Sequence, residues 1–250
     1  MIRLRKTLFA LLVIVLSAAP AVRAQIIAEG AVVTDYMWRG YNVLNGAPAF
    51  QPTVTGILGE TGFDVNAWFS FALRDREQQA IRDLDEMDLT LTYSRSIGMV
   101  DVRAGVFTYH LFTHDEYPDA DFTFVREAFG GVTFTSLPLS PWVVYNYELV
   151  DAGGNDWYLE LGADQSVSLP MNQELLLSLH AGWYSAEWAG LGGQLTDLSL
   201  TVGLPVIPVH GDGTWLSPWM MAAYTPPEHV NPNQFEVVAG MTLSGVFLAR

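Results

Sequence analysis

Hydrophobic and polar residues alternate along most of this chain. Between positions 63 and 73 the apolar members of the alternation are Phe63, Val65, Ala67, Phe69, Phe71 and Leu73. The same period of two returns over residues 86–94, 156–164, 197–204 and 235–244. This period is typical of β-strands whose two faces meet different surroundings.

The alternation predicts twelve strands, separated alternately by tight turns and by longer loops. We place them at 31–41, 49–58, 63–74, 84–95, 100–112, 122–135, 141–151, 156–167, 174–186, 195–204, 214–225 and 235–248. Each has about ten residues or more, whereas an ordinary strand has about five or six. A tilted strand of about ten residues crosses a bilayer. The prediction is therefore an all-β fold, an antiparallel up-and-down transmembrane β-barrel of about 12 strands.

The first 24 residues have the pattern of a secretory signal peptide. Arg3, Arg5 and Lys6 precede a short apolar run, and the small residues of Val22–Ala24 predict cleavage after Ala24. We therefore expect a signal peptide at 1–24, a barrel domain at 25–250 and a location in a bacterial outer membrane. No later segment has about 18 uninterrupted apolar residues, so a transmembrane helix is not expected.

Composition supports a membrane barrel over a soluble β-sandwich, which would alternate in the same way. Half of the residues are hydrophobic and the mean hydropathy is +0.21. The only lysine lies in the signal segment, and a soluble surface without lysine is unusual. After residue 24 there are 8 basic and 27 acidic residues, a net charge of 8 − 27 = −19, which argues against nucleic acid as a partner. The chain contains no cysteine, so no disulfide framework is expected.

One segment resembles a known family. Thr34-Asp35-Tyr36-Met37-Trp38-Arg39-Gly40, followed by Pro48-Ala49-Phe50-Gln51, is similar to the opening motif of the proteobacterial Gcw_chp family, also described as TorF-like. Thr34 and Trp38 stand where that motif usually has serine and phenylalanine. The resemblance implies an outer-membrane β-barrel, with outer-membrane lipid and lipopolysaccharide around it and the barrel-assembly machinery as a partner.

Strand parity places many ionisable residues on the face opposite the apolar one. A charge that faced lipid would cost a few kcal/mol, so these residues are expected in the lumen. The candidate solute path comprises Asp35, Arg39, Glu86, Asp88, Arg103, Glu127, Glu148 and Glu160. Asp64, Arg74, Asp101, Asp164, Asp197 and Glu236 share their face. Arg39 can form an internal pair with the nearby Asp35.

Two functions fit this lumen. The first is a porin-like channel that passes small cationic or neutral solutes, because acidic residues outnumber arginines and acidic pores favour cations. The second is a non-conducting structural or interaction barrel whose interior is filled by ion pairs. A lipid-modifying enzyme is a weaker third, motivated by Ser178 and His180 on one face, for which the sequence offers no third group. No nucleotide-binding, metal-binding or catalytic motif is present, so no enzyme, cofactor or metal is predicted.

Overall fold

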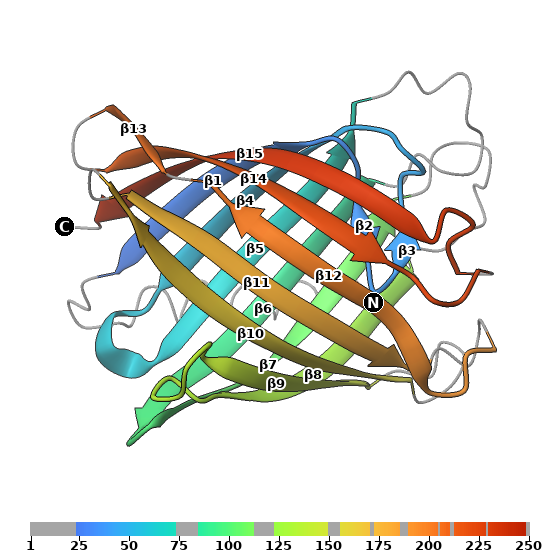
Figure 1. Cartoon of the computed structure of the whole chain (residues 1–250). Helices are drawn as coiled ribbons and strands as arrows, with labels where there is room; N and C mark the ends of the chain where they lie inside the picture. The colour runs from blue at the N-terminus through green and yellow to red at the C-terminus, as the bar shows by residue number, and fades with distance from the viewer. Residues whose placement is uncertain are drawn as a thin grey trace, which may run out of the picture.

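The computed structural model shows a β-barrel (Figure 1). It describes residues 24–73, 85–112, 123–149, 156–170, 173–185, 190–204, 206–210, 213–228 and 230–248. Its long strands are β1 (Gln25–Val33), β4 (Ala49–Ile57), β5 (Phe63–Ala72), β6 (Asp85–Ile97), β7 (Val100–Phe112), β8 (Thr123–Thr133), β9 (Pro141–Glu148), β10 (Trp157–Leu169), β11 (Gln173–Tyr184), β12 (Gln194–Gly203), β14 (Thr214–Tyr224) and β15 (Phe235–Leu248). The short elements are β2 (Met37–Trp38), β3 (Tyr41–Asn42), a 3-10 turn at Gly59–Thr61 and β13 (Ile207–His210).

The twelve long strands close on themselves. Each pairs antiparallel with its neighbour in the order of the chain, β1 pairs with β15, and β12 pairs with β14. Because every long strand has a partner on both sides, no sheet edge is left unpaired. The prediction of an antiparallel barrel of about 12 strands is confirmed.

The two rims of the barrel differ. Gln25 at the start of β1 lies opposite Leu248 at the end of β15, so both described ends lie at one rim. Short connections at 58–62, 98–99 and 134–140 lie at this same rim, which we call the turn rim. The opposite one is the loop rim. Two of the longer connections between the predicted strands, the acidic segments 75–83 and 113–121, lie outside the described residues. Almost all of the predicted signal peptide does as well, and its removal stays a prediction.

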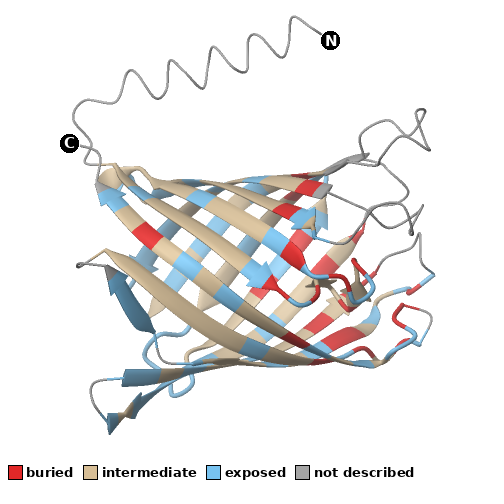
Figure 2. Ribbon diagram, turned by 90° about the horizontal axis from the view of Figure 1, so that it is seen from above, coloured by how far each residue is buried: buried red, intermediate tan, exposed pale blue. Residues whose placement is uncertain are grey.

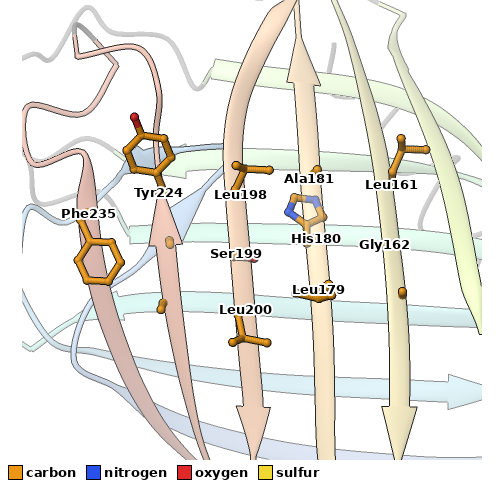
Figure 3. Close-up of a pocket in the computed structure, with 13 residues that line it drawn as sticks. Leu161, Gly162, Leu179, His180, Ala181, Leu198, Ser199, Leu200, Tyr224 and Phe235 are labelled. Atoms are coloured by element: carbon orange, nitrogen blue, oxygen red, sulfur yellow. The ribbon is translucent and has the colours of Figure 1, made fainter. Parts of the chain in front are cut away.

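The outer surface is apolar. Large side chains that stay exposed in the isolated chain, such as Val54, Leu91 and Leu179, alternate with lumen-facing neighbours along each strand. On β10–β12 and β14–β15 this outer face forms a shallow apolar groove of about 560 Å³ (Figure 3). An apolar belt on a closed barrel is the surface that a bilayer requires. No helix in the described part of the chain is long and apolar enough to span a membrane.

A charged substitution on this apolar outer surface tests which face of the wall contacts lipid. Leu200 points outward on β12, and the next residue, Thr201, points into the lumen. We expect Leu200→Arg to destabilise the folded barrel by about 2–4 kcal/mol, the cost of an arginine near the bilayer midplane. Thr201→Arg should cost much less, because a lumenal guanidinium keeps contact with water. Urea unfolding in lipid vesicles measures both, and equal losses would contradict the assigned faces.

The first strand differs from the prediction. The alternation predicts a strand at 31–41, but β1 covers Gln25–Val33 and the chain then leaves the wall of the barrel. Arg39 and Gly40 have φ angles of 48° and 87°, which a β-strand does not allow. The family motif therefore lies in a loop rather than in a wall strand. Residues 34–48, which connect β1 to β4 and contain β2 and β3, are called the plug below.

Candidate functional site: a plug inside the barrel

The plug is anchored where it leaves and rejoins the wall. Its Leu44 and Ala47 pack with Val33 of β1, Ala49 of β4 and Val238 of β15 in one buried apolar cluster. All five side chains are at most 3% exposed. In Figure 2, buried residues gather toward the loop rim, where the plug lies. The base of the plug is thus buried in an apolar cluster that it shares with β1, β4 and β15.

Asp35 ties the two ends of the plug together. Its carboxylate accepts hydrogen bonds from the Tyr36 amide at 2.8 Å, from the Asn42 side chain at 2.6 Å and from the Gly46 amide at 3.1 Å. Burial raises the pKa of Asp35, and these hydrogen bonds partly oppose that shift. The sequence suggested a pair between Asp35 and Arg39, but Asp35 instead holds the loop closed on itself.

Arg39 at the tip of the plug pairs with Glu127 of β8. Its two terminal nitrogens donate to the two carboxylate oxygens at 2.9 and 2.6 Å. Tyr109 of β7 donates a further hydrogen bond to Glu127 at 2.9 Å. The paired side chains are only 7% and 4% exposed. Burial alone would lower the pKa of Arg39, but the carboxylate outweighs it and raises that pKa, so the guanidinium stays charged.

The guanidinium of Arg39 also lies against three aromatic rings. Its central carbon is 4.6 Å from the ring centre of Trp38, 4.4 Å from that of Tyr158 on β10 and 5.0 Å from that of Tyr184 on β11. A desolvated cation over an aromatic face gains about 2 kcal/mol. Together with Glu127, these rings make a box that is complementary to one planar cation.

Other plug residues reach the remaining walls. Tyr36 packs on Trp68 of β5, with ring centres 5.4 Å apart. The carbonyl of Gly40 accepts a hydrogen bond of 2.9 Å from Thr225, which follows β14. Trp38 meets Tyr109 and Tyr184 edge to face, at 5.8 and 5.9 Å. The plug therefore contacts strands on opposite sides of the barrel and spans the lumen below the loop rim.

A second polar cluster lies beside the plug, on the lumen face of β10, β11 and β12. His180 lies between two carboxylates: Nδ1 is 2.9 Å from Asp197 and Nε2 is 3.4 Å from Glu160. Tyr158 donates to Asp197 at 3.0 Å, and Asn146 donates to Glu160 at 2.8 Å. We call Glu160, His180 and Asp197 the histidine cluster.

A cavity of about 370 Å³ connects the plug and the histidine cluster. Met37, Trp38, Arg39 and Gly40 form one side of it, and side chains of the histidine cluster form another. Gly182 on β11 helps to make this arrangement possible, because a Cβ there would collide with the Tyr158 hydroxyl and the Asp197 carboxylate. The cavity shows that the plug does not fill the part of the lumen next to β10–β12.

Comparison with known proteins places the chain in a family. A family model described as "Bacterial protein of unknown function (Gcw_chp)" matches residues 17–203. The chain belongs to the Gcw_chp family. The match includes the motif at Thr34–Gly40, which the structure places in the first half of the plug, from the wall to the tip. No curated protein matches the sequence.

Solved structures with a similar shape are outer-membrane barrels. The KdgM porin in complex with disordered oligogalacturonate has a TM-score of 0.51 at 6% identity, covering 89% of this chain and 99% of its own. The COG4313 outer membrane channel from Pseudomonas putida F1 has a TM-score of 0.48 at 11% identity, covering 92% and 97%. The NanC porin has a TM-score of 0.47 at 7% identity, covering 90% and 100%. The likeness to the KdgM porin shows that this Gcw_chp protein has a porin-type fold.

The structure places the predicted lumen residues of this Gcw_chp barrel in three settings: at the plug, in the histidine cluster, and elsewhere on the wall. Asp35, Arg39 and Glu127 hold the plug, whereas Glu160 belongs to the histidine cluster. Glu86 is buried on β6, and nearby Asp88 has a buried oxygen without a hydrogen-bond partner among the described residues. Glu148 lies opposite Glu127 in the β8–β9 register, and Arg103 is exposed near the turn rim.

The sequence does not predict the aromatic box around Arg39, and the role of His180 in the structure differs from the predicted one. Tyr158 and Tyr184 have no motif around them, and only their parity on β10 and β11 points to the lumen. His180 was paired with Ser178 as a candidate catalytic base, but both ring nitrogens face carboxylates. This geometry holds the imidazole as a fixed partner of Asp197 and Glu160 and leaves no ring nitrogen to activate Ser178.

Proposed function

We propose that this Gcw_chp barrel is an outer-membrane channel for small solutes, narrowed by its plug. The observation that carries the proposal is the space that remains in the lumen beside a plug that crosses it. The cavity of about 370 Å³ under the plug is lined by Asn146, Glu160, His180 and Ser199. A further cavity of about 550 Å³ lies on the turn-rim side.

The charge of the lumen favours cationic or neutral solutes over anions. Glu127 is matched by Arg39, and Asp197 by His180, so these pairs contribute little net charge. Glu160 adds negative charge on β10, whereas Arg103 is the arginine on the lumen face nearest the turn rim. Acidic groups around a pore attract cations.

Conductance of the refolded protein in a planar bilayer tests the proposal. We expect discrete current steps whose reversal potential in a KCl gradient shows preference for K⁺ over Cl⁻. A variant in which residues 37–42 are replaced by a short glycine-serine linker should conduct more, because the tip of the plug is gone. An anion-selective current would contradict the proposed solute class.

The plug also supports a second candidate, a non-conducting barrel that acts through its loops. Arg39, Trp38 and Tyr36 contact the wall on several sides, and such contacts can close a lumen completely. The variant with the linker separates the two functions. If it remains silent across salts and voltages, like the unmodified protein, the channel is excluded and the structural role is favoured.

A further inference from the structure

Two lumenal cavities lie along the same wall of the barrel. The cavity under the plug touches Glu160 of β10, His180 of β11 and Ser199 of β12. The cavity nearer the turn rim touches the same three strands lower down. Its polar lining residues include Asp164, Ser166, Ser178, Thr201 and Ser217, beside apolar residues such as Leu176 and Trp219. Both spaces therefore share one wall, β10–β12, with β14 beside it.

Strand geometry places the two cavities one after the other along β11 and β12. Residues two apart on a strand share a face and are separated by about 7 Å. Ser178 thus directly follows His180 on the lumen face of β11, and Thr201 follows Ser199 on β12. His180 lies between Gly162 and Ser199 on the adjacent strands, as the pairing and Figure 3 show. Polar side chains therefore follow the histidine cluster toward the turn rim, beside the ring of Trp142, which packs against His180.

The charge of the histidine cluster is negative whichever form the imidazole takes. Two carboxylates and an imidazolium sum to −1, and a neutral imidazole would leave −2. Asp197, which Tyr158 and His180 contact, is 9% exposed at its side chain, whereas Glu160, which Asn146 and His180 contact, is 25% exposed. Glu160 is therefore the carboxylate that a solute in the cavity can reach.

The rest of the cavity suits a small cation that carries hydrogen-bond donors. Ser199 and Glu160 offer acceptor oxygens, and Phe107 lines the same space with an aromatic ring, whereas the rings of Trp38 and Tyr158 already hold Arg39. Ammonium groups bind favourably to such faces. The volume of about 370 Å³ lies at the lower end of the range of ligand pockets, about 300–1,000 Å³.

We infer that solutes cross this barrel along the β10–β12 wall, and that the histidine cluster is a binding site for small amines and other monovalent cations on that path. The inference rests on the proposed channel function and adds the route and the solute class. It assigns Glu160 as the residue that sets selectivity. His180, held by Asp197, positions Glu160, and the Glu160 carboxylate keeps the site negative.

Neutralising Glu160 tests the selectivity. We expect Glu160→Gln to lower the permeability of K⁺ and of methylammonium relative to Cl⁻ by about twofold to threefold, the loss of one nearby charge in a wet pore. Asp64→Asn is the matched control, because it removes an acid from the lumen face of β5, outside both cavities. Asp64→Asn should change the permeability of cations relative to Cl⁻ less than Glu160→Gln does. If Asp64→Asn lowers selectivity and Glu160→Gln does not, the inference is overturned.

Cysteine labelling tests the route independently of selectivity, because the chain has no cysteine of its own. Ser178→Cys and Thr201→Cys should lose current when a positively charged methanethiosulfonate reagent is added. Thr90→Cys on the lumen face of β6 should lose much less, and Leu200→Cys on the outer face should not respond. Equal block at Thr90→Cys would overturn a path along one wall. Silence of the unlabelled protein and of its linker variant would instead remove the channel itself.

Discussion

Arg39→Ala will release the tip of the plug and increase the single-channel conductance severalfold. The substitution leaves Glu127, which is 3% exposed, without its cation, and it empties the box formed by Trp38, Tyr158 and Tyr184. Removal of one partner from a buried ion pair costs about 3–5 kcal/mol. That cost shifts the ratio of docked to undocked plug by roughly 100- to 1,000-fold or more, since 1.4 kcal/mol is about a factor of ten.

A second arginine on the lumen face provides the control. Arg103→Ala removes an equal charge from the lumen face near the turn rim, away from the plug, and should leave the conductance close to that of the unmodified protein. Arg39→Lys should give an intermediate result, because an ammonium cannot form the two parallel hydrogen bonds to Glu127. The double variant Arg39→Ala with Glu127→Gln should lose less docking than the sum of the two single variants. An unchanged current in Arg39→Ala would show that the ion pair does not hold the plug.

Gly40→Ala will displace the tip of the plug by a different route. Gly40 has a φ of 87°, and a Cβ there would lie 2.6 Å from the carbonyl oxygen of Thr196. That oxygen belongs to the backbone and cannot move aside cheaply. The substitution therefore pushes the tip away from the wall and weakens the hydrogen bond from Thr225 to the Gly40 carbonyl. We expect larger and noisier currents than in the unmodified protein.

Gly46→Ala is the matched comparison within the same loop. Gly46 has a φ of 80°, but a Cβ there meets nothing within 4 Å. It shares the backbone strain, which costs about 1–3 kcal/mol, without the collision. Gly40→Ala should therefore open the lumen well beyond Gly46→Ala. Equal conductance in the two variants would assign the effect to backbone strain alone and contradict the steric role of Gly40.

Most of the barrel wall can be predicted from the sequence. From Ala49 onward, the predicted strands match the observed ones to within a few residues, because lipid and water select opposite residue types at alternate positions. The first strand is the exception. Residues Thr34 to Trp38 directly continue the alternation of β1 and are of types that a wall strand also contains, and a lumen filled by protein accepts the same residues as a lumen filled by water. The period of two cannot distinguish the two cases.

The sequence by itself determined that the chain forms a barrel of about twelve strands, and it predicted that most charged strand residues face the lumen, because a charge facing lipid is costly whatever its partner. Only the tertiary structure decided how those charges are used. Arg39 and Glu127 are 88 positions apart, and the strand register brings them together. His180 finds Glu160 and Asp197 on the strands at either side of it. Such pairings depend on which strands become neighbours and at what register, and the spacing of residues along the chain does not specify either.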